Sequence, residues 1–360
     1  RIRKAKDSYN QPSLPTSHDS LSSILFRNSV LKSHYSSPSK VVSATYGLFG
    51  YPARMNTSIG PFECAVVSQS QRAAALALLV SGDPFSERNE RIARIAAALR
   101  TGDSTTATLV GAMRDEELTA VAWGQILLGK TALLWPPRLA PKEIASVGDR
   151  LQEFLDQQLQ AAGIRMAQAV LSNREHADAQ RLERVGYSHA ADLLYLISPL
   201  EQLASTGGFD IDFVQYTCSE RERLAALVER TYVDTLDVPA LDGVRDMSDV
   251  LCGYEQTGEF SPDRWFFIRH EGQDVGCLLL NDHPAQQQWE LVYLGIVPEA
   301  RGNGWGRQAT RFAQGLARQA GRARLILAVD AANDPAVSAY TSAGFFELLR
   351  RSVFLKIFTD

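Results

Sequence analysis

Residues 291–310 read LVYLGIVPEARGNGWGRQAT, and this stretch decides the fold of the chain. The apolar run that ends at Pro298 is typical of a β-strand, and the apolar residues from Ala309 onward recur at helical spacing. Glycines at 302, 304 and 306 lie between these two patterns. Glycine permits backbone conformations and close approaches that side chains prevent, and the first turn of a helix presents unpaired N–H groups. The stretch therefore predicts a strand, a loop suited to an anion such as a pyrophosphate, and a helix.

Two common phosphate-binding loops do not fit this glycine pattern. A Walker loop continues with Gly-Lys-Ser/Thr, whereas Arg307 and Gln308 follow here. A dinucleotide-binding loop has the spacing GxGxxG early in a βαβ unit, whereas this loop reads GxGxG and follows several expected strands. Arg301 and Arg307 add positive charge at the rim of the loop. A glycine-rich turn that is only a tight connection remains the alternative.

The segment resembles motif A of the GNAT superfamily of acetyl-CoA-dependent N-acyltransferases. The signature of that motif, Gln/Arg-x-x-Gly-x-Gly/Ala after a strand, is matched by Arg301, Gly304 and Gly306. A second signature of the family, Asn-x-x-Ala-x-x-x-Tyr-x-x-x-Gly-Phe, is matched by Asn333, Ala336, Tyr340, Gly344 and Phe345. The two signatures lie within residues 289–346, and the order of expected strands and helices extends the resemblance over 208–360.

The resemblance implies a splayed sheet with acyl-CoA in the gap between two strands. The backbone of Ile296 and Val297 would hold the pantetheine arm like an added strand, and Asn333 would bind the arm from the other side. The pyrophosphate would lie beside Arg301 on the backbone N–H groups of the glycine-rich loop, which are those of Gly302, Asn303, Gly304, Trp305, Gly306 and Arg307.

Amide formation from a thioester needs a base for the amine and a proton donor for the leaving thiolate. The family places a tyrosine beside the CoA sulfur, and Tyr340 matches it; the alternative is a tyrosine that only packs in the core. Glu290 lies eleven residues before Arg301, where the histone-acetyltransferase branch carries its catalytic glutamate. It is therefore the expected base, with a solvated glutamate at a strand end as the alternative.

The stretch 234–246, DTLDVPALDGVRD, falls where the family places its acceptor-binding helix and loop. It carries four aspartates, at 234, 237, 242 and 246, and one arginine, at 245. Acidic side chains at that place could hold a cationic amine. Aspartates that cap a helix or form turns in a solvated loop are the alternative.

Residues 61–207 repeat the order of elements that is expected over 208–360. From Pro137 to Gly186 is 49 residues, and from Pro298 to Gly344 is 46. Helices are expected at 92–99 and 144–159, and a strand at 132–135 should end at the prolines that follow it. Residues 138–143 contain no glycine, and only Asn173 and Gly186-Tyr187 echo the second signature.

The fold class is therefore α/β (α+β), with two tandem GNAT-like domains joined by a linker around 205–208. Each is expected to be a mixed, mostly antiparallel, splayed sheet flanked by helices. The first, at 61–207, is expected to be degenerate and supportive, and the second, at 208–360, catalytic. Tandem family members of the mycothiol synthase type show such an architecture.

Residues 1–60 differ in composition from the rest. They hold eight Lys/Arg, two Asp/Glu and thirteen serines, whereas the other 300 residues hold 29 Lys/Arg and 39 Asp/Glu. A segment of this kind buries too little apolar surface to fold, and it is expected to be a disordered tail. Its basic, serine-rich character also fits an organelle-targeting segment or a start-site artefact. The expected compartment is otherwise the cytoplasm.

The overall composition excludes several classes of protein. The sequence contains no run of 18 apolar residues, so no membrane span is expected. The net charge of −4 is unlike that of a basic nucleic-acid binder. Cys64, Cys218, Cys252 and Cys277 form no metal-binding pattern with histidines, so no metal is expected. The resemblance implies an enzyme that moves an acetyl group from acetyl-CoA to a primary amine of a small molecule or peptide. A non-catalytic acyl-CoA sensor and a tRNA-dependent aminoacyl transferase are the alternatives.

Overall fold

The computed structural model describes residues 61–82, 107–127, 129–201, 208–241 and 246–358, together with residues 88, 92, 95, 96 and 99. The tail expected at 1–60, most of the helix expected at 92–99 and the linker expected at 205–207 lie outside the described residues. Among the described helices, none is both long and apolar enough to cross a membrane.

The N-terminal half begins with a short strand and a helix, followed by a three-stranded antiparallel meander. A helix then leads to a strand parallel to the last strand of the meander, as in a βαβ unit. Its elements are β1 (Glu63–Val66), α2 (Arg72–Leu79), β2 (Ala107–Arg114), β3 (Glu117–Leu127), β4 (Thr131–Leu139), α4 (Ala145–Ala161), β5 (Met166–Leu171), α5 (Ala177–Arg184) and β6 (Ser188–Pro199).

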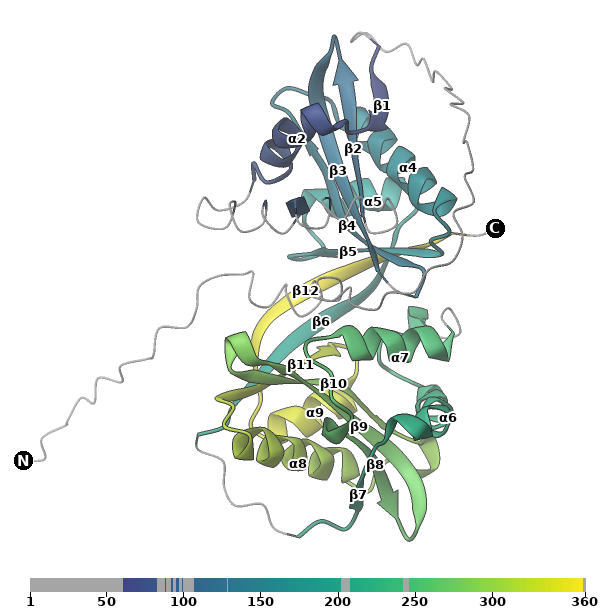
Figure 1. Ribbon diagram of the computed structural model, residues 1–360, viewed down its shortest axis with the longest axis vertical. Helices are drawn as coiled ribbons and strands as arrows, with labels where there is room; N and C mark the ends of the chain where they lie inside the picture. Colours follow the sequence, from purple (N-terminus) through teal and green to yellow (C-terminus); the bar gives the residue numbers. More distant parts are fainter. Residues whose placement is uncertain are drawn as a thin grey trace, which may run out of the picture.

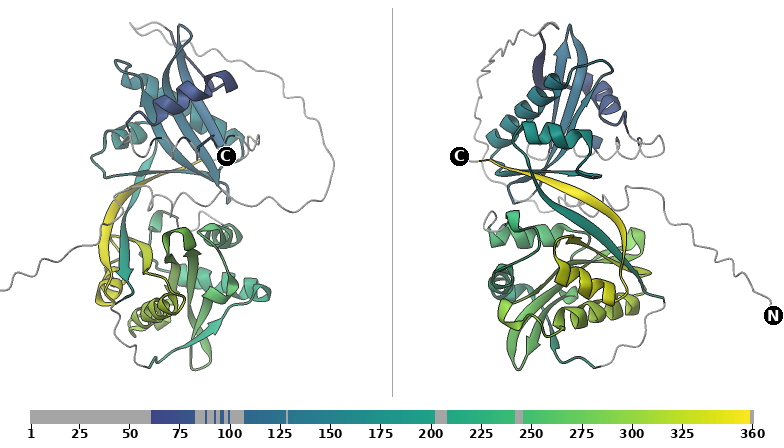
Figure 2. Two further views of the ribbon diagram at one scale, coloured as in Figure 1. Left: turned by 60° about the vertical axis from the view of Figure 1, so that its left-hand side comes forward. Right: turned by 180° about the vertical axis from the view of Figure 1, so that it is seen from behind.

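The C-terminal half repeats this order of elements. Its elements are β7 (Asp212–Gln215), α6 (Arg221–Tyr232), α7 (Met247–Gln256), β8 (Trp265–His270), β9 (Gln273–His283), β10 (Gln288–Ile296), α8 (Trp305–Gln319), β11 (Arg324–Asp330), α9 (Asp334–Ser342) and β12 (Phe346–Ile357). Helices cover both faces of the sheet (Figure 2).

One expected strand end is wrong. The strand expected at 132–135 runs on through Pro136 and Pro137 to Leu139. Its pairing with β3 shifts by one residue at this place, and its other edge has no β5 partner beyond Leu134. Proline is tolerated at a bulge and along an unpaired edge because no ladder hydrogen bond is lost there.

The two halves exchange their last strands. The sheet has twelve strands in the order β1-β2-β3-β4-β5-β12-β6-β11-β10-β9-β8-β7, so β6 pairs with β11 and β12 pairs with β5. The two exchanged strands also pair with each other, and they cross between the halves as two long ribbons (Figure 1). The element order alone did not show this exchange, which makes one continuous sheet of the two copies.

A polar bond fixes each exchanged strand to a helix of the half that it enters. Lys356 on β12 donates to Asp156 on α4 at 2.8 Å, and Tyr187 donates to the other oxygen of that carboxylate at 2.6 Å. Ser198 on β6 accepts a bond from Gln314 on α8 at 2.8 Å. All these bonds lie within or at the edge of an apolar core, where an unpaired polar group would be costly.

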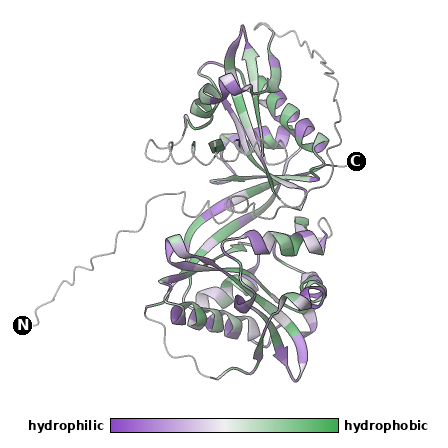
Figure 3. Ribbon diagram, viewed as in Figure 1, coloured by the Kyte–Doolittle hydropathy of each residue, from purple (hydrophilic) through white to green (hydrophobic). Residues whose placement is uncertain are grey.

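Each half has its own main core. Helix α4 buries Val147, Leu151, Leu155 and Leu159 against the N-terminal strands, as its spacing predicts. Helix α8 buries Ala309, Ala313 and Ala317 against β10 and β11, and their small side chains bring the helix close to the sheet. The ribbon coloured by hydropathy shows these apolar faces turned toward the strands (Figure 3).

Both halves contain the expected splay. β10 pairs with β11 only over Gln288, Trp289 and Glu290, although β10 continues to Ile296. β4 pairs with β5 only over its first four residues, from Thr131 to Leu134. The mixed, mostly antiparallel, splayed architecture is confirmed, and each half has a gap beyond the short parallel pairing.

Candidate functional site

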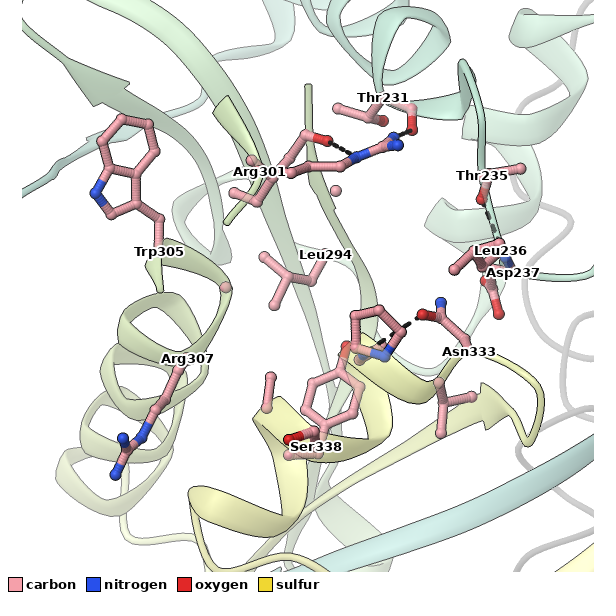
Figure 4. Close-up of a pocket in the computed structure, with 18 of the residues that line it drawn as sticks. Thr231, Thr235, Leu236, Asp237, Leu294, Arg301, Trp305, Arg307, Asn333 and Ser338 are labelled. Atoms are coloured by element: carbon pink, nitrogen blue, oxygen red, sulfur yellow. Dashed lines mark hydrogen bonds between the residues drawn. The ribbon is translucent and has the colours of Figure 1, made fainter. Parts of the chain in front are cut away.

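The gap in the C-terminal half contains a cavity of about 650 Å³. It is lined by the loop after α6, the splayed part of β10, the glycine-rich loop, the start of α8, the end of β11, and α9 (Figure 4). Most of the residues that the two sequence signatures single out therefore lie around one space.

The glycine-rich loop has the backbone that the sequence predicts. Gly302 has φ +84° and Gly304 has φ +74°, in the left-handed region that favours glycine. No heavy atom outside the neighbouring backbone lies within 4 Å of where a Cβ would stand on Gly302, Gly304 or Gly306. Helix α8 begins at Trp305, so its first N–H groups face an open concavity that suits an anion.

The sequence analysis expected Arg301 to add positive charge at the rim of the loop, but its side chain does not project freely there. Its guanidinium donates to the carbonyl oxygens of Thr231, Val233 and Asp234 at 2.8–3.1 Å, and its Nε donates to that of Ile296 at 3.1 Å. The last carbonyls of a helix lack intrahelical partners, which explains why a cation binds at the end of α6. Arg301 therefore ties the glycine-rich loop to the loop after α6.

Two other side chains of the loop take different places. Arg307 is exposed, lines the cavity and makes no ion pair with the described part of the chain. Of the two arginines that line the cavity, Arg307 is therefore the one available to bind an anion. Asn303 lies outside the cavity lining, and its amide donates to the carbonyl of Ala300 at 3.1 Å. Its side chain therefore braces the turn.

One of the two residues whose backbone was expected to face the gap, Val297, does not face it. The N–H of Val297 donates to Val275 on the β9 side at 3.0 Å, so Val297 cannot offer that group to the gap. Neighbouring residues of a strand turn their backbone groups to opposite sides. Ile296 and Leu294 therefore present theirs to the cavity, which both residues line. Leu294 replaces Val297 in the expected pair.

Asn333 and Tyr340 reach the cavity from α9. Asn333 caps this helix, because its Oδ1 accepts a bond from the N–H of Ala336 at 3.3 Å, and its amide nitrogen is left for the cavity. Tyr340 is buried and packs near Phe345, yet its side chain also lines the cavity. Burial, with a smaller contribution from the charge of Asp237, raises the pKa of the Tyr340 phenol. The phenol therefore stays protonated and able to donate.

Glu290 is buried, so the alternative of a solvated strand-end glutamate is wrong. Its Oε2 lies 2.7 Å from Nε2 of His283, which is also buried. Burial raises the pKa of the Glu290 carboxyl, and the bond to His283 offsets only part of that rise. Glu290 lies outside the cavity lining, one residue before Leu291, which is part of it. Sequence reasoning missed His283, since no short-range pattern links it to Glu290.

The corresponding gap of the N-terminal half is filled by charged side chains. Arg138 at the end of β4 and Arg181 on α5 both bind Asp178 at 2.7 Å. Asp178 is buried, and Arg181 also donates to the carbonyl of Pro137 at 3.2 Å. These bonds cross from the splayed strand to the helix that faces it. The cap of α5 is His176, whose Nδ1 accepts a bond from the N–H of Asp178 at 3.2 Å.

Other kinds of site find no support in the part of the chain that the structure describes. No group of three His, Cys, Asp or Glu side chains there is arranged to hold a metal ion. All four cysteines are free thiols. Burial raises the pKa of Cys64 to about 11 and that of Cys277 to about 12, so neither is an activated nucleophile.

Residues 232–345 match the sequence model of the acetyltransferase (GNAT) family. The matched segment is thus similar to a GNAT acetyltransferase domain, and it includes both sequence signatures and most of the residues around the cavity. Its curated relatives include the mycothiol acetyltransferase of Streptomyces bingchenggensis, 37% identical over 106 residues, which are 28% of this chain and 32% of that protein. That of Saccharomonospora viridis is 29% identical over 192 residues, 49% of this chain and 60% of that protein. The chain thus matches between a third and three fifths of the length of these relatives.

Solved structures show the same fold. A GCN5-related N-acetyltransferase from Sphaerobacter thermophilus aligns over 82% of this chain and 95% of its own, with 17% identity and a TM-score of 0.55. A GCN5-related glucosamine N-acetyltransferase region of a fungal multi-domain β-N-acetylglucosaminidase aligns over 84% of this chain and 39% of its own, with 14% identity and a TM-score of 0.57. Since these alignments extend well beyond the C-terminal half, the fold they share includes both halves of the sheet.

Proposed function

We propose that the chain transfers an acetyl group from acetyl-CoA to the primary amine of a small molecule, with the chemistry in the C-terminal half. The observation that carries this proposal is the cavity in the gap between β10 and β11, which joins the glycine-rich loop to Tyr340. The names of the curated relatives, mycothiol acetyltransferases, support acetyl transfer to a small-molecule acceptor. The catalytic unit comprises 208–360 together with the exchanged strand β6, and 61–187 supports it.

The residues around the cavity suit acetyl-CoA as a co-substrate. The N–H groups at the start of α8 and the side chain of Arg307 would bind its phosphates. The inward-facing backbone of Leu294 and Ile296 would pair with the amide groups of the pantetheine arm, as a strand pairs with its neighbour. The free amide nitrogen of Asn333 would bind the arm from the side of α9.

The reaction then involves three proton transfers, the last of which returns a proton to the Tyr340 phenolate. An ammonium acceptor first loses a proton to become a nucleophile, and its nitrogen attacks the thioester carbonyl carbon. As the carbon–nitrogen bond forms and the carbon–sulfur bond breaks, Tyr340 donates its proton to the leaving thiolate. The nitrogen releases a further proton to reach the neutral amide. Glu290 is the proposed base, acting through water because it lies outside the cavity lining, and His283 positions its carboxyl group.

Thiol release from acetyl-CoA tests this function, with D-glucosamine and n-butylamine as the first acceptors. Tyr340→Phe should lower kcat about 100-fold, the usual size of an acid–base contribution, while calorimetry finds the acetyl-CoA Kd within about twofold of wild type. The double variant Glu290→Gln/Tyr340→Phe should also keep its affinity and lose turnover. Tight binding with no thiol release from any primary amine would support the sensor instead, and absence of binding would overturn both.

A further inference from the structure

The loop after α6, residues 233–241, forms one wall of the cavity and is held at three places. Arg301 binds the carbonyls at its start. The carboxylate of Asp330, at the end of β11, accepts a bond from the N–H of Val238 at 3.2 Å. Leu241 packs on a small apolar cluster formed by β5, β6 and β12. The loop is thus fixed to the glycine-rich loop, to the splayed strand and to the exchanged strands.

Asp237 lies in the middle of this loop and lines the cavity. One of its oxygens accepts a bond of 3.3 Å from the N–H of Asp330. Within the part of the chain that the structure describes, its side chain makes no ion pair, and its other carboxylate oxygen accepts no hydrogen bond. The side chain is exposed, and because it lines the cavity that exposed surface is available to a ligand.

Among the residues that the structure describes, no cationic side chain is in place to neutralise this carboxylate. The cationic side chains of the lining are Arg301 and Arg307. Arg301 is fully engaged with backbone carbonyls, and Arg307 lies on α8 beyond the glycine-rich loop (Figure 4). Desolvation of the carboxyl group in the cavity wall, with a smaller contribution from the charge of Asp330, raises the pKa of Asp237. The neighbourhood of Asp237 therefore has an excess of negative charge, which a bound cation would compensate.

Asp237 acts on the proposed proton donor from across the cavity. Its charge adds to the effect of burial in raising the pKa of Tyr340, and it also contributes to the raised pKa of Tyr293 on β10. Tyr340 is 7% exposed, and its hydroxyl makes no hydrogen bond with the residues that the structure describes. The Tyr340 side chain and the unpaired carboxylate of Asp237 thus line the same space.

We propose that Asp237 binds the ammonium group of the acceptor and makes the site selective for cationic primary amines. This inference rests on the proposed function, because it places the acceptor at the Tyr340 end of the acetyl-CoA cavity. A charge-assisted bond from the ammonium group to the free carboxylate oxygen would orient the nitrogen beside the thioester before the proton is removed. Leu236, which is 49% exposed and also lines the cavity, gives the carbon skeleton of the acceptor an apolar contact.

The test compares Asp237→Asn with Asp234→Asn. Both residues carry a carboxylate, both lie on the same loop and line the cavity, but only Asp237 acts on Tyr340. With D-glucosamine or n-butylamine as acceptor, Asp237→Asn should raise KM for the amine at least tenfold, whereas Asp234→Asn should change it less than about threefold. The acetyl-CoA Kd should be unchanged in both. Equal effects of the two substitutions, or a loss of acetyl-CoA affinity in Asp237→Asn, would overturn the proposal.

A second measurement needs no turnover. Calorimetric titration of the CoA-loaded protein with n-butylammonium chloride and with n-butanol compares a cation with a neutral molecule of similar shape. Wild type should prefer the ammonium at least tenfold, and Asp237→Asn should lose that preference. Equal binding of the two by wild type would show that Asp237 holds no cation, even if acetyl transfer is observed. Preference for the ammonium without thiol release would keep the cation site and overturn only the proposed function.

Discussion

The two halves share one topology but treat the same gap in opposite ways. In the C-terminal half, the space beyond the parallel pairing is lined by glycines, backbone edges and the side chains of α9. In the N-terminal half, the buried carboxylate of Asp178 and the guanidinium groups of Arg138 and Arg181 occupy it. Helix α4 of the N-terminal half also lies close to these side chains, since a Cβ on Gly148 would stand 2.8 Å from Nε of Arg181. Ion-paired side chains that fill the gap leave no room for a ligand.

The positions of the proposed catalytic residues differ in the same sense. Counted from the first paired residue of the parallel strands, Leu133 stands where Glu290 stands in the other half. Counted back from the glycine after the short helix, Leu182 stands at the place of Tyr340. Both leucines are buried. The comparison teaches that the fold supplies a gap, while a few side chains decide whether it is a site or a core.

The largest expected effect comes from closing the open gap to anions. Gly304→Glu puts a carboxylate where the phosphates would bind and should weaken acetyl-CoA binding about 1,000-fold, or ~4 kcal/mol. Gly321→Glu is the matched control, because Gly321 follows the other end of α8, has φ +72° and also has open space around it. Calorimetry should find the control near wild type. A Gly304→Glu protein that binds acetyl-CoA normally would place the phosphates elsewhere.

A smaller effect is expected from opening the filled gap. Asp178→Ala leaves Arg138 and Arg181 without their shared partner and should destabilise the protein by about 3 kcal/mol, as removal of one member of a buried ion pair does. Urea denaturation measures this loss. The acetyl-CoA affinity should stay within about twofold of wild type, because the N-terminal gap has no glycine-rich loop. A marked change in affinity would mean that both gaps serve the ligand.

The smallest effect concerns the exchanged strand. Lys356→Met removes the cation that faces Asp156 and should cost about 2 kcal/mol at neutral pH. Burial already raises the pKa of Asp156, and the substitution should raise it further. A carboxyl group whose pKa is higher in the folded than in the unfolded protein contributes stability that is lost as pH rises through the folded-state pKa. The difference between variant and wild type should therefore be larger at pH 8 than at pH 4.5.

Denaturation at the two pH values measures that difference, and hydrogen exchange shows where it acts. The lost protection should fall on α4 and β5 of the N-terminal half, although Lys356 follows the C-terminal half in the sequence. A pH-independent loss would mean that Asp156 is not the group involved. Protection lost only around α8 and β11 would mean that β12 stabilises the C-terminal half and not the N-terminal half.

Sequence reasoning recovered the features that depend on neighbours along the chain. The left-handed glycines, the start of α8 and the apolar stripes of α4 and α8 follow from local spacing. Asn333 and Tyr340 reach the cavity because the second signature fixes their positions on one short helix. The negative loop after α6 was also foreseen, although the part that Asp330 plays in holding it was not.

Most of the elements and the place of the glycine-rich loop follow from the sequence alone, because they rest on interactions between residues that are close in the chain. The splay of the sheet was expected only from the resemblance to the family. Only the tertiary structure decided the exchange of β6 and β12, since either strand is long and apolar enough to pair with β5 or β11. It also decided that Arg301 binds the end of α6 and that Val297 faces β9. These outcomes depend on competition among distant groups for the same hydrogen bonds and the same buried space, which no local pattern records.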